Sequence, residues 1–290
     1  MKRLSTRLLQ FTVLQLICLA LFLSGKASAQ SSLTVAAKGV YGIYENSLVD
    51  VFRSGRGDIY YNNRAKTWWL ALGWRHTDIT VDKTDGEPAR SDHLRVSLAR
   101  TFYTRHRGSF TLALEGSALW APFPAVDQTF PGYLSLSWFS PAGRYYADLN
   151  LHYFPNDLAD KAEVSATWGM ALFNYYVWAQ ASGHFSFYEQ PVQNIKWGWS
   201  VHPELTWYPV PRKLTLTAYG IFGEQVLSYN PSTLVLYTTD VMLTVNLGLT
   251  AYYQLGKHLK PYADVQYERY DDQGFQFSAV YYTFGLFYKF

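Results

Sequence analysis

Large apolar side chains recur at every second position through segment after segment of residues 66–290. Leu149 and Leu151, for example, share one parity, while Asp148 and Asn150 share the other. A period of two is typical of β-strands with one apolar and one polar face. The pattern therefore predicts an all-β chain.

The two faces differ in a way that indicates what the apolar one contacts. The polar parity carries small and charged groups, and the apolar parity carries aliphatic residues that often end in Trp, Tyr or Phe. The apolar stretches run for roughly 8–11 positions, about the length of a tilted strand that crosses a bilayer core. Beyond residue 30 there is no apolar run long enough for a spanning helix. Because open strand edges are not tolerated in lipid, the sheet must close into a barrel.

The N-terminal segment 1–29 has the features of a secretory signal. Basic residues precede an apolar run, and Ala27-Ser28-Ala29 fits a small-x-small cleavage site, which predicts a mature chain of residues 30–290. An uncleaved anchor is the alternative, but the apolar run is shorter than the ~20 residues of a spanning helix. The segment carries four basic residues and no acidic one, so its removal changes the net charge from +3 to −1. That charge predicts no nucleic-acid partner.

The only cysteine, Cys18, lies in this segment. The mature chain is therefore predicted to lack disulfides, thiol catalysis and cysteine-based metal sites.

The last strand carries a further signature. Large apolar residues occupy alternate positions up to the C-terminal residue Phe290 in YYTFGLFYKF. With the signal peptide and the alternating strands, this ending resembles bacterial outer-membrane β-barrel proteins. The resemblance covers the whole mature chain at the level of architecture, and no motif defines a subfamily. It implies location in the outer membrane, contact with its lipid and lipopolysaccharide, and recognition of the strand ending at Phe290 by the barrel-assembly machinery.

The connections give the strand number and orientation. Working back from the C-terminus, short turns alternate with mostly longer loops, as expected for periplasmic turns and outside loops. Twelve strands are clear in residues 66–290. Residues 32–64 add two and give fourteen, which we favour over twelve strands with a plug or periplasmic piece. Pro203 predicts a bulge inside its strand, and Arg100 falls on the lipid parity, where it can snorkel to the interface.

The polar parity predicts which side chains line the lumen. The candidate pore-lining residues are Arg75, Arg95, Glu115, Asp148, Glu163, Lys196, Glu204, Asp264 and Glu268. The predicted membrane-interface aromatics are Trp68, Trp74, Trp138, Trp168, Trp207 and Phe290. The lumen charges nearly balance. They can tune a water-filled pore or form a salt-bridge network that fills the barrel. A fourteen-stranded barrel lies between barrels of about eight strands, which side chains fill, and barrels of about 16–18 strands, which leave an open channel.

Catalytic motifs are weak. GHFSFYEQ resembles a His-x-Ser stretch of outer-membrane phospholipases and lipid A deacylases, but Phe187 and Tyr188 depart from it, and parity places His184 and Ser186 in the lumen. A barrel protease would need clustered acids and a histidine at the outer rim: Asp85, Glu87, Asp92 and His93 lie around one expected outer loop, and Asp157 and Asp160 lie around another. They are usual for solvated loops or for divalent ions that bridge lipopolysaccharide.

The histidines have no zinc-ligand spacing, and no phosphate-binding loop occurs. The sequence predicts neither a metal nor a cofactor. The favoured function is a passive pore for small hydrophilic solutes. The alternative is a non-conducting barrel that anchors or assists export of a surface polysaccharide or other envelope component, and an enzyme is third.

Overall fold

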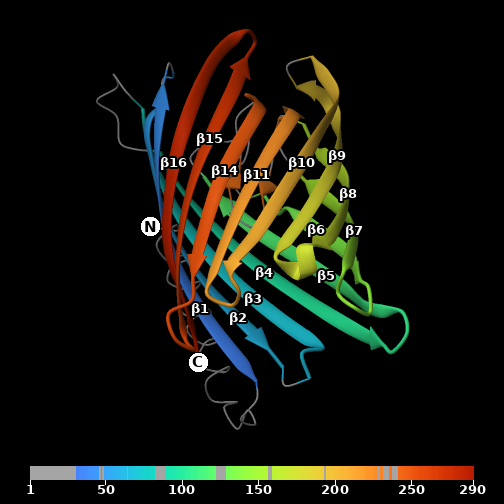
Figure 1. Cartoon of the computed structure of the whole chain (residues 1–290). Helices are drawn as coiled ribbons and strands as arrows, with labels where there is room; N and C mark the ends of the chain where they lie inside the picture. Colours follow the sequence, from blue (N-terminus) through green and yellow to red (C-terminus); the bar gives the residue numbers. More distant parts are fainter. Residues whose placement is uncertain are drawn as a thin grey trace, which may run out of the picture.

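The computed structural model is a closed antiparallel barrel of fourteen strands (Figure 1), which confirms fourteen over twelve. It describes residues 31–45, 47, 49–63, 65–81, 89–121, 129–155, 159–192, 194–226, 229–230, 235–236 and 241–290. The predicted signal peptide lies outside these residues. The barrel strands are β1 (Ser32–Glu45), β2 (Val49–Asn62), β3 (Trp68–Val81), β4 (Ala89–Thr104), β5 (Gly108–Trp120), β6 (Gly132–Phe139), β7 (Tyr145–Phe154), β8 (Lys161–Leu172), β9 (Val177–Val192), β10 (Ile195–Val210), β11 (Leu214–Gln225), β14 (Met242–Tyr253), β15 (Leu259–Asp272) and β16 (Phe275–Lys289).

The barrel closes between its first and last strands. β1 pairs with β16 from Thr34 opposite Lys289 to Glu45 opposite Ser278, and it pairs with β2 on its other edge. The backbone N–H of Phe290 extends this seam by donating to the carbonyl of Leu33 at 2.9 Å. Residues 32–45 and 49–62 therefore form two wall strands and not a plug.

One small element was not predicted. β12 (Tyr229–Asn230) and β13 (Val235–Leu236) pair as a two-stranded sheet in the connection between β11 and β14.

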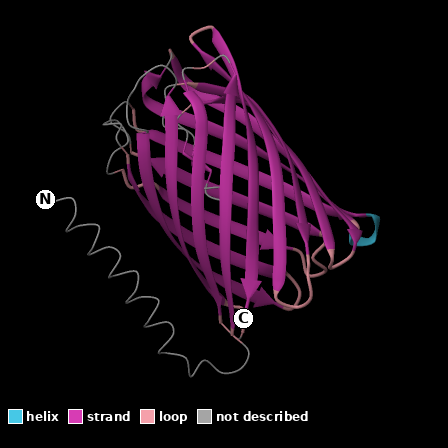
Figure 2. Ribbon diagram, turned by 90° about the vertical axis from the view of Figure 1, so that its left-hand side faces the viewer, coloured by secondary structure: helices cyan, strands magenta, loops and turns pink. Residues whose placement is uncertain are grey.

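Short turns gather at the end of the barrel where the C-terminus lies (Figure 2). In the turn between β2 and β3, the Asn63 side-chain oxygen accepts hydrogen bonds from the backbone of Thr67 and Trp68, at 2.8 and 2.9 Å. The short helix η2 (Phe173–Tyr175) forms another such turn. Within the described ranges, no helix has the length and apolar character needed to cross a bilayer.

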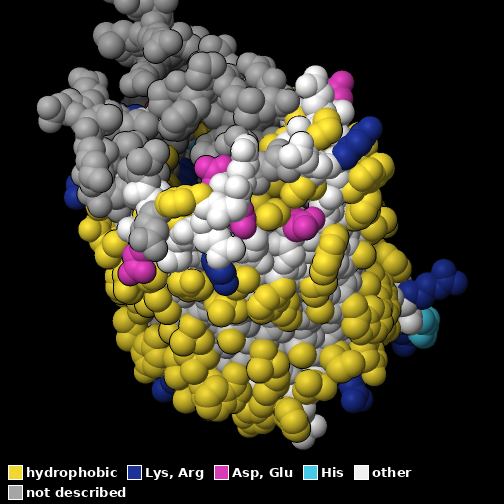
Figure 3. All heavy atoms as spheres, turned by 90° about the horizontal axis from the view of Figure 1, so that it is seen from above, with side chains coloured by type: hydrophobic (Ala, Val, Ile, Leu, Met, Phe, Trp, Pro, Cys, Tyr) yellow, Lys and Arg dark blue, Asp and Glu magenta, His cyan; other side chains and the backbone are white. Residues whose placement is uncertain are grey.

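Burial alternates along the strands with the polar side chains inside. Asn150 is 6% exposed, whereas its neighbours Leu149 and Leu151 are 49% and 46% exposed. Apolar side chains cover much of the visible outer wall (Figure 3). This inversion of the usual arrangement suits a barrel whose outer face meets hydrocarbon.

The prediction of a bulge at Pro203 is wrong. Pro203 pairs with Ala181 of β9, and the register with β11 is unchanged from Val201–Phe222 to Glu204–Tyr219. No pair with β11 is recorded at Pro203 itself. The proline, which has no N–H to donate, therefore interrupts one ladder locally without an inserted residue.

Arg100 lies on the outer wall, as its parity predicts, and contacts aromatic rings. Its guanidinium carbon is 4.9 Å from the centroid of the Trp68 ring and 4.8 Å from that of Phe102. Cation–π attraction stabilises an arginine placed in this way among apolar neighbours.

Candidate functional site in the barrel lumen

The inner wall carries three groups of polar side chains. We define the arginine cluster as Arg56, Asp58, Arg75, Arg95 and Glu115 on β2–β5. The histidine cluster is Lys161, Glu163, His184 and His202 on β8–β10, and the acidic cluster is Tyr219, Asp264 and Glu268 on β11 and β15. They follow from strand alternation, which directs every second side chain inward.

The arginine cluster is centred on Asp58, whose side chain is fully buried. Arg56 binds its carboxylate through two nitrogens, with N–O distances of 2.6 and 2.8 Å. Arg95 of β4 reaches both Asp58 of β2, at 3.5 Å, and Glu115 of β5, at 3.7 Å. It therefore links β5 to β2, and the contact with Asp58 passes over β3. Arg75 donates to Ser54 Oγ at 2.5 Å. Buried charges of this kind are tolerated because each one has a partner.

The histidine cluster is centred on Glu163. This carboxylate contacts Lys161 Nζ at 2.7 Å and His184 Nδ1 at 2.8 Å, and it accepts a hydrogen bond from Ser186 at 2.9 Å. The ring of His202 stacks on that of His184, with centroids 3.8 Å apart. Four strands, β8 to β11, are connected in this way, because Gln225 of β11 also lies 2.8 Å from His202 Nε2.

The acidic cluster spans β11, β14 and β15. Asp264 accepts hydrogen bonds from Thr250 at 2.6 Å and Tyr219 at 3.1 Å, and Glu268 accepts one from Asn246 at 2.9 Å. The Tyr219 ring lies directly over Gly248 of β14, where a Cβ would clash with it. The glycine therefore makes room for a tyrosine that bridges alternate strands.

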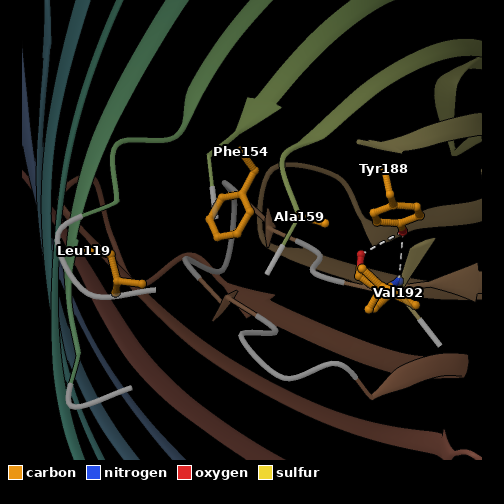
Figure 4. Packing of buried hydrophobic residues seen from close by; sticks show 6 residues of the cluster. Leu119, Phe154, Ala159, Tyr188 and Val192 are labelled. Atoms are coloured by element: carbon orange, nitrogen blue, oxygen red, sulfur yellow. Dashed lines mark hydrogen bonds between the residues drawn. The ribbon is translucent and has the colours of Figure 1, made fainter. Parts of the chain in front are cut away.

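Two apolar groups lie inside the barrel at the end opposite the C-terminus. We call them mouth clusters. The first is Leu119, Phe154, Ala159, Tyr188, Val192 and Val226 (Figure 4), and the second is Phe52, Leu243, Tyr270, Ala279 and Tyr281. In the first, the Tyr188 hydroxyl donates to the Val226 carbonyl at 2.9 Å. Large side chains on the inner wall narrow this end of the lumen.

Most of the predicted pore-lining residues lie on the inner wall. Arg75, Arg95, Glu163, Asp264 and Glu268 are at most 8% exposed. The other three on this wall, Glu115, Asp148 and Glu204, are half-buried. Their role in a pore stays a prediction.

Lys196 departs from the predicted position. It lies at a register shift between Ile195 and Trp197, is exposed, and has its ammonium 5.7 Å from the centroid of the Phe187 ring. Phe187 packs against Trp197, which is 54% exposed on the outer wall. The irregular register changes the parity, which a strict period of two could not foresee.

The aromatics predicted at membrane interfaces lie on the outer side. Trp68, Trp74, Trp168, Trp207 and Phe290 are 41–62% exposed. Trp138 is half-buried and donates from its indole N–H to the Arg107 carbonyl at 2.7 Å. Their depth in a membrane stays a prediction.

The residues that the sequence analysis named as catalytic candidates make other contacts in the structure. His184 and Ser186 both hydrogen-bond to Glu163, which differs from a serine activated by its own histidine. Asp92 and His93, expected in a loop, lie in β4. Asp160 accepts a hydrogen bond from Tyr153, and the remaining loop acids lie outside the described residues. In the described part of the chain, no three His, Cys, Asp or Glu residues gather as a metal site would need.

Two members of the arginine cluster were missed, Arg56 and Asp58. They lie in the segment where alternation is least regular, because β2 carries Gly55 and Gly57 on its outer face. The signal that could have found them is the inner parity of Ser54, Arg56 and Asp58.

Comparisons with known proteins match the fold and not the sequence. No protein-family model and no curated protein matches the chain. Among solved structures, a deletion mutant of the monoaromatic hydrocarbon channel TodX matches with a TM-score of 0.59 and 10% identity, covering 90% of each chain. The Ralstonia pickettii toluene transporter TbuX matches with a TM-score of 0.56 and 9% identity over 90% of each chain. The Acinetobacter baumannii outer-membrane protein Omp33 matches with a TM-score of 0.50 and 9% identity, over 89% of this chain and 99% of that one.

At such identities the likeness shows the fold. This chain has the fold of bacterial outer-membrane β-barrel proteins, as its resemblance implied.

Proposed function

We propose that the barrel is a passive channel for small hydrophilic solutes. The observation that carries this proposal is the inner wall, where hydrogen-bonded polar side chains extend from β2 around to β15 while the outer face is apolar. Such a wall offers donors and acceptors to a hydrated solute, which is how pores of this kind replace part of a solute's hydration.

The charges on this wall favour weak selectivity. The arginine cluster has three cations and two anions, the histidine cluster pairs one lysine with one glutamate, and the acidic cluster adds two carboxylates. The signs nearly balance but lie in separate sectors of the wall. We expect the resulting field across the lumen to orient dipolar solutes more than it selects ions by sign.

The mouth clusters favour a small bore. Both lie at the same end, and together they draw side chains from β2, β5, β7, β9, β14, β15 and β16. We expect small solutes to pass and large ones to be excluded at this level.

Single-channel recording in planar bilayers tests the proposal. The purified barrel should give stable conductance steps. Glu204→Gln removes an inner-wall charge that has no ion-pair partner among the described residues, and it should lower cation preference. Lys38→Gln removes a half-buried inner-wall lysine of β1, whose ammonium lies 4.9 Å from the centroid of the Tyr262 ring, and it should raise cation preference. Asp78→Asn, on the outer face of β3, is the matched control and should leave the permeability ratio unchanged. Silence at all voltages would contradict a channel and favour a non-conducting barrel that anchors or assists export of an envelope component.

A second candidate is passage of small apolar solutes, which the aromatic mouth clusters and the fold shared with hydrocarbon channels favour. Liposomes that contain the barrel discriminate the two. Swelling in small sugars supports the hydrophilic channel, whereas accelerated entry of toluene without swelling supports the apolar one.

A further inference from the structure

A groove of about 400 Å³ crosses the outer wall on β16, β1, β2 and β3. Its rim includes Tyr41, Arg53, His76, Asp78, Tyr282 and Phe284, and Gly39 and Gly55 form its floor. The exposed Tyr41, Tyr282 and Phe284 place it on the outer face and not in the lumen. It is therefore separate from the proposed channel.

The floor is formed by two glycines that face each other. Gly39 lies opposite Gly55 in the β1–β2 register, with Phe284 beyond Gly39 and His76 beyond Gly55. A Cβ built on either glycine would meet nothing within 4 Å. Neighbouring strands lie ~4.8 Å apart, so two facing residues without side chains leave a gap roughly 10 Å wide on the outer face. A gap of this width accommodates an acyl chain.

One rim carries Arg53, a cation without an ion-pair partner among the described residues. Asp78 is 3.1 Å from Arg90 and 3.5 Å from His76, and Asp92 is 2.9 Å from His76. Arg53 lies opposite Asp78 in the register, is exposed, and makes no ion pair with any residue that the structure describes. A guanidinium at a lipid-facing wall is well suited to a phosphate, which it can bind through two parallel hydrogen bonds.

The groove lies toward the end of the wall opposite the C-terminus. Arg53 is near the start of β2, and His76 and Asp78 are near the end of β3. With the periplasmic C-terminus of such barrels, this end faces the outer leaflet, whose phosphate-bearing lipid is lipopolysaccharide. We propose that the groove binds one lipopolysaccharide molecule, with a lipid A phosphate on Arg53 and an acyl chain over Gly39 and Gly55.

Native mass spectrometry of barrel refolded without lipid and titrated with purified lipid A tests the site. The wild-type barrel should retain one lipid A. Arg53→Gln and Gly55→Leu should each weaken retention at least several-fold, because one removes the cation and the other fills the floor. Gly39→Leu provides a second filling variant if Gly55→Leu does not refold. The matched controls are Arg90→Gln, which removes an arginine already paired with Asp78, and Gly57→Leu, which adds a side chain outside the groove; both should retain lipid A as wild type does.

Equal retention by wild type, Arg53→Gln and the filling variants would overturn the site. Equal retention of dephosphorylated lipid A would overturn the role of the phosphate. Equal competition by phosphatidylglycerol would overturn lipopolysaccharide as the occupant. Since the controls and the groove variants leave the lumen unchanged, the result does not depend on whether the barrel conducts.

Discussion

Asp58 is a carboxylate of the inner wall that is shared by two arginines. Its side chain is fully buried and contacts both Arg56 and Arg95. Sequence periodicity predicted that Arg75, Arg95 and Glu163 face inward, because it requires only parity. It could not predict that Asp58 bridges two arginines, since the contact with Arg95 joins β2 and β4, which are not neighbouring strands.

Asp58→Asn should lower the free energy of unfolding by about 3–5 kcal/mol, because it removes the buried carboxylate that Arg56 and Arg95 share. Urea unfolding of the barrel in phospholipid bilayers, followed by tryptophan fluorescence, measures the change. Asp78→Asn is the control, since its exposed outer-face pairs should contribute at most about 1 kcal/mol. Equal effects of the two substitutions would show that burial of Asp58 is not what makes it costly to replace.

Single-tryptophan variants test which face each indole occupies. Trp168, which is 52% exposed on the outer wall, should be quenched by brominated lipids. Trp178, which packs near Tyr146 and donates to Gln180 Oε1 at 3.0 Å on the inner wall, should be protected. Equal quenching of the two would contradict the assignment of faces.

At the scale of strands, the predicted faces are confirmed where alternation is regular, and two local predictions in β10 are wrong for different reasons. The fourteen strands and their two faces follow from the period of two. Lys196 was misplaced because β10 has a register shift there, and Pro203 was misread because a missing N–H does not force an inserted residue. Local register depends on the partner strand, which a single strand's sequence does not describe.

The contact between Gly248 and Tyr219 joins β11, β14 and β15. Gly248→Ala should displace the Tyr219 ring from Asp264 and destabilise the barrel by about 1–3 kcal/mol, as overpacking does. Gly57→Ala should change stability little, because nothing lies within 4 Å of its Cβ position. The same urea titration measures both, and a stable Gly248→Ala barrel would mean that the tyrosine has room to move.

The terminal strand offers a test of assembly. Phe290 is 62% exposed and extends the seam through one backbone hydrogen bond to Leu33, so its ring adds little to the folded barrel. We expect Phe290→Ala to reduce the amount assembled in the outer membrane of cells several-fold while refolding in detergent proceeds as for wild type. Phe222→Ala, which truncates an exposed aromatic of β11, is the control. Equal assembly of all three chains would contradict recognition through Phe290.

For the whole molecule, the physical basis of the fold is the inverted distribution of side chains. Charged and polar groups interact inside the barrel, and leucine, valine and aromatic side chains are exposed outside. Composition and periodicity were sufficient to predict this arrangement, because lipid requires it along every strand. They were not sufficient to predict the mouth clusters, each of which brings together residues from at least three strands, or the groove at Gly39 and Gly55, which forms only when two glycines fall into register.

A nitroxide scan of positions 147–153 in β7 tests most directly whether the outer face meets hydrocarbon. The mature chain is predicted to have no cysteine, so each position can be labelled alone. Our account predicts that accessibility to oxygen, which concentrates in the bilayer core, is high at Ala147, Leu149, Leu151 and Tyr153 and low at the positions between them. Uniform accessibility along the strand, or maxima at Asp148, Asn150 and His152, would contradict it.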